Sequence, residues 1–267
     1  MPASPTNSLP LNVVRTGPRG NTPVVLLHSV GLDLTYWDHQ IEVLRHHYDV
    51  VALDLPGHGA SPGTPQDWTL NQAAATIAKH IEALDAGPVH VLGLSVGGMI
   101  AQALTLTHSH LARSLVLIDT AARFTGEART AMRDRAAAAR AGGMPAVVAS
   151  TLDRWFTPTT RVQRPDLIDR VSKTLLSDDA AVHAAMWDMI AELDLVEELP
   201  RISCPTLVLV GEHDPSSPPA AARTLTEHIP HATMHIVADA SHMAPLEKPA
   251  EINQHILAFL DKLPASP

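Results

Sequence analysis

The segment that most constrains the fold is residues 89–102, with the sequence VHVLGLSVGGMIAQ. It begins as a short apolar run, turns sharply at G-L-S-V-G, and continues with the apolar spacing of a helix. A Ser on such a strand-to-helix turn has its hydroxyl exposed. Gly93 and Gly97 flank Ser95 because the chain doubles back there and larger side chains would collide. We therefore take Ser95 as the candidate nucleophile.

Short apolar runs alternate with helical patterns along most of the chain. The expected strands are a weak one at residues 11–16, the run before Ser95, and residues 24–27, 48–53, 115–118, 206–210 and 234–237. The expected helices between them include residues 36–46, 70–84, 219–229 and 249–263. Near-continuous apolar strands alternating with helices predict an α/β fold with a mostly parallel, twisted sheet flanked by helices on both faces.

One stretch breaks this alternation. Residues 123–199 contain helical patterns and no convincing strand; the helices are expected at residues 131–141, 145–155, 165–176 and 180–193. Ligands of open α/β sheets bind at the carboxyl ends of the strands. We therefore expect an all-helical cap, inserted after the strand that ends near Asp119, over a core domain formed by residues 1–122 and 200–267.

A Ser nucleophile needs a general base, and the base needs an orienting acid. After a Ser on this kind of turn, the chain order is acid and then His. Asp214 follows the expected strand at residues 206–210, and His242 follows the one at residues 234–237. Both side chains are then expected at the edge of the sheet near Ser95. Asp119, at the end of the strand after the Ser helix, is the alternative acid.

The developing oxyanion needs two backbone N–H groups aimed at one point. We expect one from Val96, immediately after the nucleophile, and the other from Val30, in the loop His28-Ser29-Val30-Gly31 after the first long strand. Trp155 and Trp187 lie in the helical segment, and both are candidates for the pocket wall.

Composition excludes several classes of partner. The formal net charge of −9 argues against nucleic acid and anionic membranes. No apolar run is long enough to span a membrane, and the N-terminus lacks the features of a signal peptide. The lone Cys204 fits a reducing compartment, so a cytoplasmic location is expected. No metal-ligand string or phosphate loop is present, so no metal or cofactor is expected, and nothing specifies an oligomeric state.

Four stretches carry a family resemblance, which extends from His28 to the end of the chain. They are YWDHQIEVLRHHYDVVALDLPGHGAS, GLSVGGMIAQALTLTHSHLARSLVLIDTAAR, AGGMPAVVASTLDRWFTP, and GEHDPSSPPAAARTLTEHIPHA with ASHMAPLEKPAE. The chain resembles an α/β-hydrolase of the 3-oxoadipate enol-lactonase group. The AGGM…RWFTP string is the more discriminating one, because the others are shared by much of the superfamily.

The resemblance implies cofactor-free hydrolysis of a small enol-lactone in aromatic-acid degradation. Two other functions would use the same triad: a carboxylesterase, and a C–C bond hydrolase that acts on a ring-cleavage product. A non-catalytic ligand receptor on the same scaffold is a third alternative. The chain departs from the family at Pro56, where the group carries Arg, at Ser29, where many relatives have Gly, and at the bulky Trp187. The group's lactone carries a carboxylate, so a cap Arg is expected to bind it. Arg154, beside Trp155, is the first candidate among Arg123, Arg129, Arg133, Arg135, Arg140 and Arg154.

Overall fold

The computed structural model describes residues 10–63 and 68–264. Within them, seven strands form one sheet in the order β1-β3-β2-β4-β5-β6-β7. β1 is antiparallel to β3, and every other neighbouring pair is parallel. The strands are β1 (Val13–Thr16), β2 (Pro23–Leu27), β3 (Asp49–Leu53), β4 (Val89–Leu94), β5 (Ala112–Ile118), β6 (Thr206–Gly211) and β7 (Ala232–Val237). The predicted, mostly parallel sheet is confirmed.

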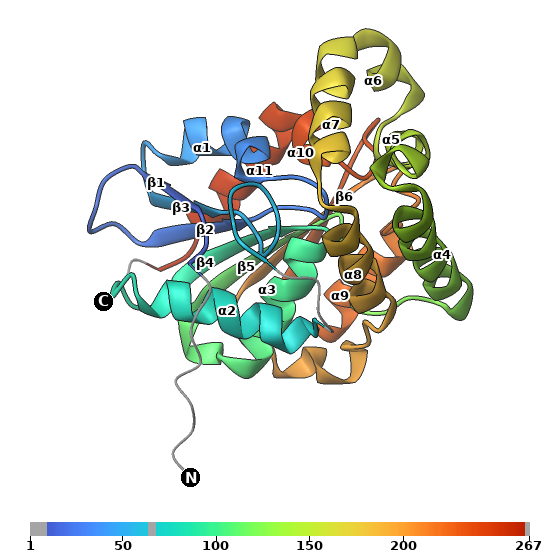
Figure 1. Cartoon of the computed structure of the whole chain (residues 1–267). Helices are drawn as coiled ribbons and strands as arrows, with labels where there is room; N and C mark the ends of the chain where they lie inside the picture. The colour runs from blue at the N-terminus through green and yellow to red at the C-terminus, as the bar shows by residue number, and fades with distance from the viewer. Residues whose placement is uncertain (1–9, 64–67, 265–267) are drawn as a thin grey trace.

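Helices cover both faces of the sheet (Figure 1). α1 (Asp38–Leu44) and α11 (Pro249–Leu260) lie on one face, and α2 (Leu70–Glu82) and α3 (Val96–Thr107) on the other. α9 (Pro219–His228) packs beside β6 and β7. Every residue of β2, β3, β4 and β6 is buried, so both faces of the sheet need helices to cover them. Within the described ranges, no helix is both long and apolar enough to cross a bilayer.

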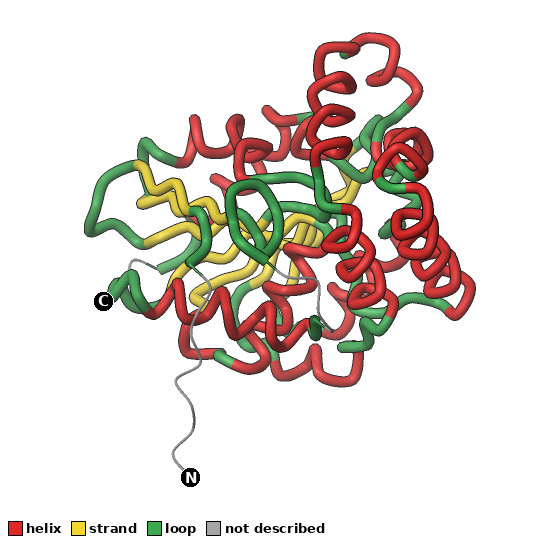
Figure 2. Tube along the Cα trace, viewed as in Figure 1, coloured by secondary structure: helices red, strands yellow, loops and turns green. Residues whose placement is uncertain are grey.

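The chain between β5 and β6 is helical, as expected of a cap inserted after the strand near Asp119. Figure 2 shows only helices and loops in this stretch, and Figure 1 shows them gathered at one end of the sheet. They are α4 (Gly126–Gly142), α5 (Val148–Trp155), α6 (Pro158–Gln163), α7 (Pro165–Ser177) and α8 (Ala180–Ala191). α4 and α8 pack side by side. The exact division at residues 122/123 and 199/200 stays a prediction.

Some helix boundaries differ from the sequence prediction. α4 begins at Gly126 rather than residue 131 because Thr125 caps it, its hydroxyl accepting a hydrogen bond from the Ala128 N–H at 3.3 Å. The first turn of α4 is polar, so the apolar periodicity from which a helix is predicted starts later than the helix itself. α6 was not predicted because it buries no side chain and so has no apolar stripe. The single-turn α10 (Ala244–Glu247) was too short to detect.

Candidate active site

Ser95 occupies the tight turn between β4 and α3. Its φ of 54° and ψ of −118° are a strained conformation for a residue with a side chain. The neighbouring glycines are required, because a Cβ at Gly93 would overlap the Gly97 carbonyl and a Cβ at Gly97 would overlap the Leu27 carbonyl. The Ser95 N–H donates to Ile118 O at 2.9 Å, which ties the turn to the end of β5. The sharp turn predicted from the sequence is therefore present.

The structure brings the three predicted triad side chains together. His242 Nε2 lies 3.0 Å from Ser95 Oγ, and His242 Nδ1 lies 2.8 Å from Asp214 Oδ2. All three side chains are buried. They follow the carboxyl ends of β4, β6 and β7, which parallel pairing places at one edge of the sheet. This arrangement lets Asp214 hold the tautomer in which His242 Nε2 accepts the Ser95 proton.

Backbone donors hold the Asp214 carboxylate in place. Its Oδ1 accepts hydrogen bonds from the N–H groups of Ser216, at 2.7 Å, and Ser217, at 3.0 Å. This leaves Oδ2 for His242. The two bonds therefore fix the orientation of the carboxylate towards the His242 ring.

Asp119, the alternative acid, contacts the backbone instead of His242. Its Oδ1 accepts from Gly211 N at 2.8 Å and its Oδ2 from Ala244 N at 3.0 Å. Burial, followed by the negative charge of Asp214, raises the pKa of Asp119 well above its ordinary value. Asp119 thus joins the end of β6 to the start of α10. It lies behind the triad as a structural support, a role that the sequence did not indicate.

Glu247 is a second support that the sequence analysis missed. Its Oε2 accepts from the Ser241 N–H at 2.6 Å, one residue before His242. Its Oε1 accepts from the N–H and the hydroxyl of Thr157, both at 2.9 Å. The carboxylate therefore links the loop that carries His242 to the helical segment. No sequence signal separates this Glu from a surface residue, because its partners come from distant segments.

The loop that carries Val30 makes a tight turn under the helical segment. The Leu32 N–H donates to Ser29 O at 3.3 Å, and Gly31 has a φ of 70°, which favours Gly at the third position of such a turn. Val30 and Val96 are buried. Among the described residues, neither backbone N–H donates a hydrogen bond to another protein atom. Both N–H groups are therefore free to serve an oxyanion.

A cavity of about 320 Å³ opens beside Ser95. This volume is at the lower end of the range for small-molecule sites. Its lining residues come from the Ser95 turn, α4, α8 and the loop after Asp214: Ser95, Met99, Phe124, Thr125, Glu127, Ala128, Ala131, Met132, Arg135, Trp187, Ile190, Pro215, Ser216 and Ser217. Of the three residues predicted for the pocket wall, Trp187 is present.

Trp155 and Arg154 are not among the described residues that line this cavity. Trp155 is fully buried, and its ring centroid lies 6.3 Å from that of His242. Arg154 folds back on its own helix, where Nη1 donates to Ser150 O at 2.8 Å. Burial, with the nearby charge of Arg135, lowers the pKa of Arg154 to about 10. The expectation that these two residues line this cavity is corrected, because the Trp155 ring is buried beside His242 and Arg154 bonds to its own helix.

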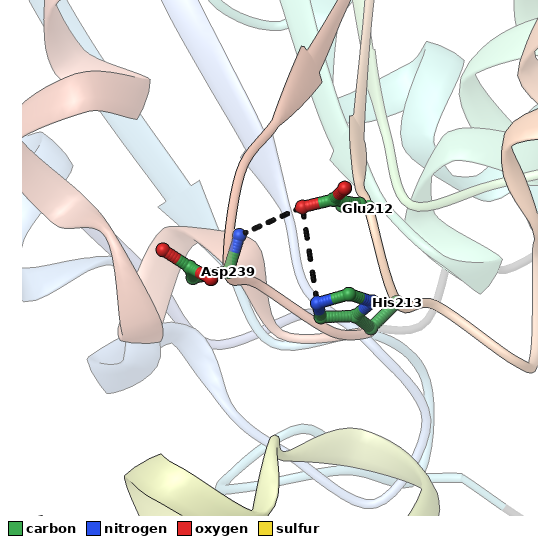
Figure 3. Close-up of side chains that lie close together, drawn as sticks. All are labelled: Glu212, His213 and Asp239. Atoms are coloured by element: carbon green, nitrogen blue, oxygen red, sulfur yellow. Dashed lines mark hydrogen bonds and ion pairs between the residues drawn. The ribbon is translucent and has the colours of Figure 1, made fainter.

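Among the residues that the structure describes, one surface group has the composition of a metal site. The side chains of Glu212, His213 and Asp239 are exposed, and their ligand atoms lie within 4.8 Å of one another. Figure 3 shows that the Glu212 carboxylate contacts the Asp239 N–H, at 3.3 Å, and the His213 ring, at 3.8 Å. These contacts join the loops after β6 and β7, which carry Asp214 and His242. Exposed acidic groups are common without an ion, so we assign this group a structural role.

Comparisons with known proteins identify the family of the chain. Over 252 residues, the chain is 29% identical to 3-oxoadipate enol-lactonase 2 of Acinetobacter baylyi, covering 94% of this chain and 93% of that protein. The crystal structure of the enol-lactonase of Burkholderia xenovorans LB400 has a TM-score of 0.91 and 30% identity, over 96% of this chain and 98% of that one.

A malate-bound esterase of Thermogutta terrifontis is similar to the same degree, with a TM-score of 0.90 and 31% identity over 98% of this chain and 96% of that one. A model described as the alpha/beta hydrolase family matches residues 24–255. That match includes Ser95, Asp214 and His242. The predicted fold and family resemblance are confirmed: the chain belongs to the alpha/beta hydrolase family.

Proposed function

We propose that the chain is a serine hydrolase that opens a small ester or lactone through an acyl-enzyme, with an enol-lactone as the favoured substrate class. The observation that carries the proposal is the pair of hydrogen bonds from Asp214 through His242 to Ser95, beside a cavity of about 320 Å³. The similarity to two enol-lactonases supports the choice of a lactone. In this proposal residues 123–199 act as the cap that closes the cavity.

Acylation begins with attack of Ser95 Oγ on the carbonyl carbon, while the hydroxyl proton passes to His242 Nε2. The negative charge that forms on the carbonyl oxygen is held by the N–H groups of Val30 and Val96. The bond to the leaving oxygen then breaks as the proton on His242 passes to that oxygen, which leaves His242 neutral for the next step. In an enol-lactone the leaving group is an enolate that becomes a ketone, which makes this step comparatively easy.

Deacylation uses one water molecule. His242 removes a proton from the water, and the hydroxyl attacks the acyl carbonyl carbon. The bond to Ser95 Oγ then breaks, and the proton on His242 returns to Ser95. The balance is one carbon–oxygen bond hydrolysed and one water consumed, with the enzyme unchanged.

A carboxylesterase is the second candidate, and the similarity to the Thermogutta terrifontis esterase favours it. The same triad also serves a C–C bond hydrolase that acts on a ring-cleavage product. A non-catalytic receptor is disfavoured, because it has no use for a hydrogen-bonded Ser95 and His242.

A fluorophosphonate probe tests the proposal. We expect it to label Ser95 alone, and we expect Ser95→Ala to abolish labelling and to lower turnover by about 10³-fold or more. Ser109→Ala is the matched control, because Ser109 is exposed and does not line the cavity. A panel of lactones, aryl esters and ring-cleavage products then ranks the substrate classes. Labelling of another Ser, or full turnover by Ser95→Ala, would refute the mechanism.

A further inference from the structure

His183 is a buried side chain with no part in the chemistry proposed for Ser95. It lies in the first turn of α8, and only 1% of the residue is exposed. Both ring nitrogens have partners: Nδ1 lies 2.9 Å from Asp178 Oδ2, and Nε2 accepts the indole N–H of Trp187 at 2.9 Å. Bonds at both nitrogens fix the plane of the ring, so it is a rigid support for the chain segment that it contacts.

The ring contacts the tight turn after β2. Gly31 has a φ of 70°, and a Cβ there would lie 3.1 Å from His183 Cε1 and 2.7 Å from Leu175 Cδ2. The backbone at Gly31 therefore packs directly against one side chain from α8 and one from α7. Both helices belong to residues 123–199, so this helical segment takes part in holding the turn.

Hydrogen bonds from the rest of the core hold the beginning of the same turn. The Ser29 carbonyl accepts from His28 Nδ1 at 2.7 Å and from the Leu32 N–H at 3.3 Å. His28 Nε2 in turn accepts from the Leu55 N–H at 2.8 Å. A peptide group is planar, so the bonds that orient the Ser29 carbonyl also orient the Val30 N–H. These bonds act before Val30, whereas the contact with the α8 ring acts after it.

The same ring is connected to the wall of the cavity. Trp187 lines the cavity together with Ser95, and it lies four residues after His183, on the same side of α8. Because its indole N–H donates to His183, a chain of contacts runs from the cavity wall through His183 to Gly31. The turn that carries Val30 and this wall of the cavity therefore share one support.

We propose that His183 is a positioning residue for the oxyanion hole, because its fixed ring keeps the turn at Gly31 in the shape that aims the Val30 N–H at the reacting oxygen. The proposal rests on the hydrolase function assigned to Ser95 and on Val30 as an oxyanion donor. Such donors act on the charge that develops in the transition state. A loosened turn should therefore weaken binding of a tetrahedral adduct and leave binding of an uncharged ketone unchanged.

Two ketones of equal chain length separate these effects, 1,1,1-trifluoroheptan-2-one and heptan-2-one. With the first, Ser95 Oγ bonds to the carbonyl carbon, the Ser95 proton passes to His242 Nε2, and the carbonyl oxygen becomes an oxyanion. The second stays an uncharged ketone. The affinity for each is measured as protection of Ser95 from the fluorophosphonate probe. We expect wild type to bind the trifluoroketone about 10²-fold or more tightly than heptan-2-one, as a transition-state analogue does.

His183→Ala should lower that ratio by about tenfold, through the trifluoroketone alone, since outright removal of an oxyanion donor costs about 10²–10³-fold and a loosened donor costs less. Asp178→Ala should also lower the ratio, because it frees the ring without changing the residues that line the cavity. It decides the question if His183→Ala does not fold. Asp178→Asn should keep the wild-type ratio, since its amide oxygen can still accept from His183 Nδ1.

Val182→Ala is the matched control. Val182 is the neighbouring buried residue of α8 and packs against a different loop, where a Cβ at Gly57 would lie 2.6 Å from Val182 Cγ1. This variant should keep the wild-type ratio. A wild-type ratio in His183→Ala overturns the proposal, and so does an equal loss of affinity for both ketones, which would mean that His183 only shapes the cavity.

The wild-type protein gives two further outcomes. If Ser95 is labelled but the two ketones bind equally well, no oxyanion is being stabilised and the role of His183 is overturned, while Ser95 remains the nucleophile. If the probe does not label Ser95, the hydrolase function itself fails.

Discussion

The indole N–H of Trp187 donates a hydrogen bond to His183 Nε2 at 2.9 Å. An indole nitrogen can only donate, so His183 Nε2 carries no proton and its Nδ1–H must donate to Asp178. The pair Asp178–His183 therefore resembles the pair Asp214–His242, because in each the carboxylate sets the tautomer of the imidazole. The His183 ring positions Trp187, whereas the His242 ring faces Ser95.

The contact between Trp187 and His183 should appear as an energetic coupling. Trp187→Phe leaves the buried His183 Nε2 without a donor, which should cost about 1–3 kcal/mol of unfolding free energy. Adding His183→Phe removes the unpaired acceptor. The double mutant should therefore be more stable than the sum of the single effects by about 0.5 kcal/mol or more. Urea unfolding of the four proteins measures this, and simple additivity would contradict it.

Asp214 and Asp119 should respond differently to replacement by Asn. Asp214→Asn should keep the fold and lower turnover by about 10⁴-fold, because the tautomer of His242 is no longer held. Asp119→Asn should lower turnover far less. It should instead cost about 1–3 kcal/mol of stability, because one of the two buried N–H donors loses its acceptor. Kinetics and urea unfolding of both variants test this assignment. Reversed results would make Asp119 the catalytic acid.

The two cap tryptophans should have separate effects on specificity. Trp155 packs against His242 from outside the cavity, so Trp155→Phe should lower kcat/KM for p-nitrophenyl acetate and for p-nitrophenyl hexanoate in parallel. Trp187 lines the cavity and Trp187→Phe loses the bond to His183, so this variant should change the ratio of the two kcat/KM values. Steady-state kinetics with the two esters gives the ratio for each variant. A change of ratio in Trp155→Phe alone would show that the two roles are exchanged.

His90 should make stability depend on pH in mild acid. Burial, with a smaller effect of Arg113, lowers the pKa of His90 from 6.5 to about 4. Between these values the unfolded chain binds a proton that the folded chain does not. His90 therefore contributes stability that is present above pH 6.5 and is lost as the pH falls towards 4. The loss is about 3 kcal/mol over the window, at 1.36 kcal/mol per pH unit.

His90→Asn provides the test, because Asn can replace the bond from His90 Nδ1 to Ser114 Oγ, which is 2.7 Å long. The difference in unfolding free energy between pH 6.5 and pH 4.5 should be smaller in this variant than in the wild type. Glu82→Gln, on the surface of α2, controls for the removal of an unrelated titrating group. An equal acid dependence in His90→Asn and wild type would assign the acid sensitivity to other groups.

The sequence by itself was enough to predict the α/β architecture and the three triad candidates. The strands are short apolar runs with polar turns at their ends. This pattern can be recognised in the sequence without knowing how the helices pack. Ser95, Asp214 and His242 each follow a buried strand, and parallel pairing brings the carboxyl ends of such strands to one edge. Local pattern and chain order therefore suffice for these residues.

Only the tertiary structure separated Arg135 from Arg154 and Asp119 from Asp214. The arginines of residues 123–199 look alike in sequence, but in the structure Arg135 lines the cavity beside Ser95 and Arg154 bonds to the Ser150 carbonyl of its own helix. Asp119 also ends a strand at the correct edge, but backbone N–H groups from two distant segments occupy both its oxygens. Such contacts join residues far apart in the chain, so they depend on the packing of whole elements and leave no local sequence signal.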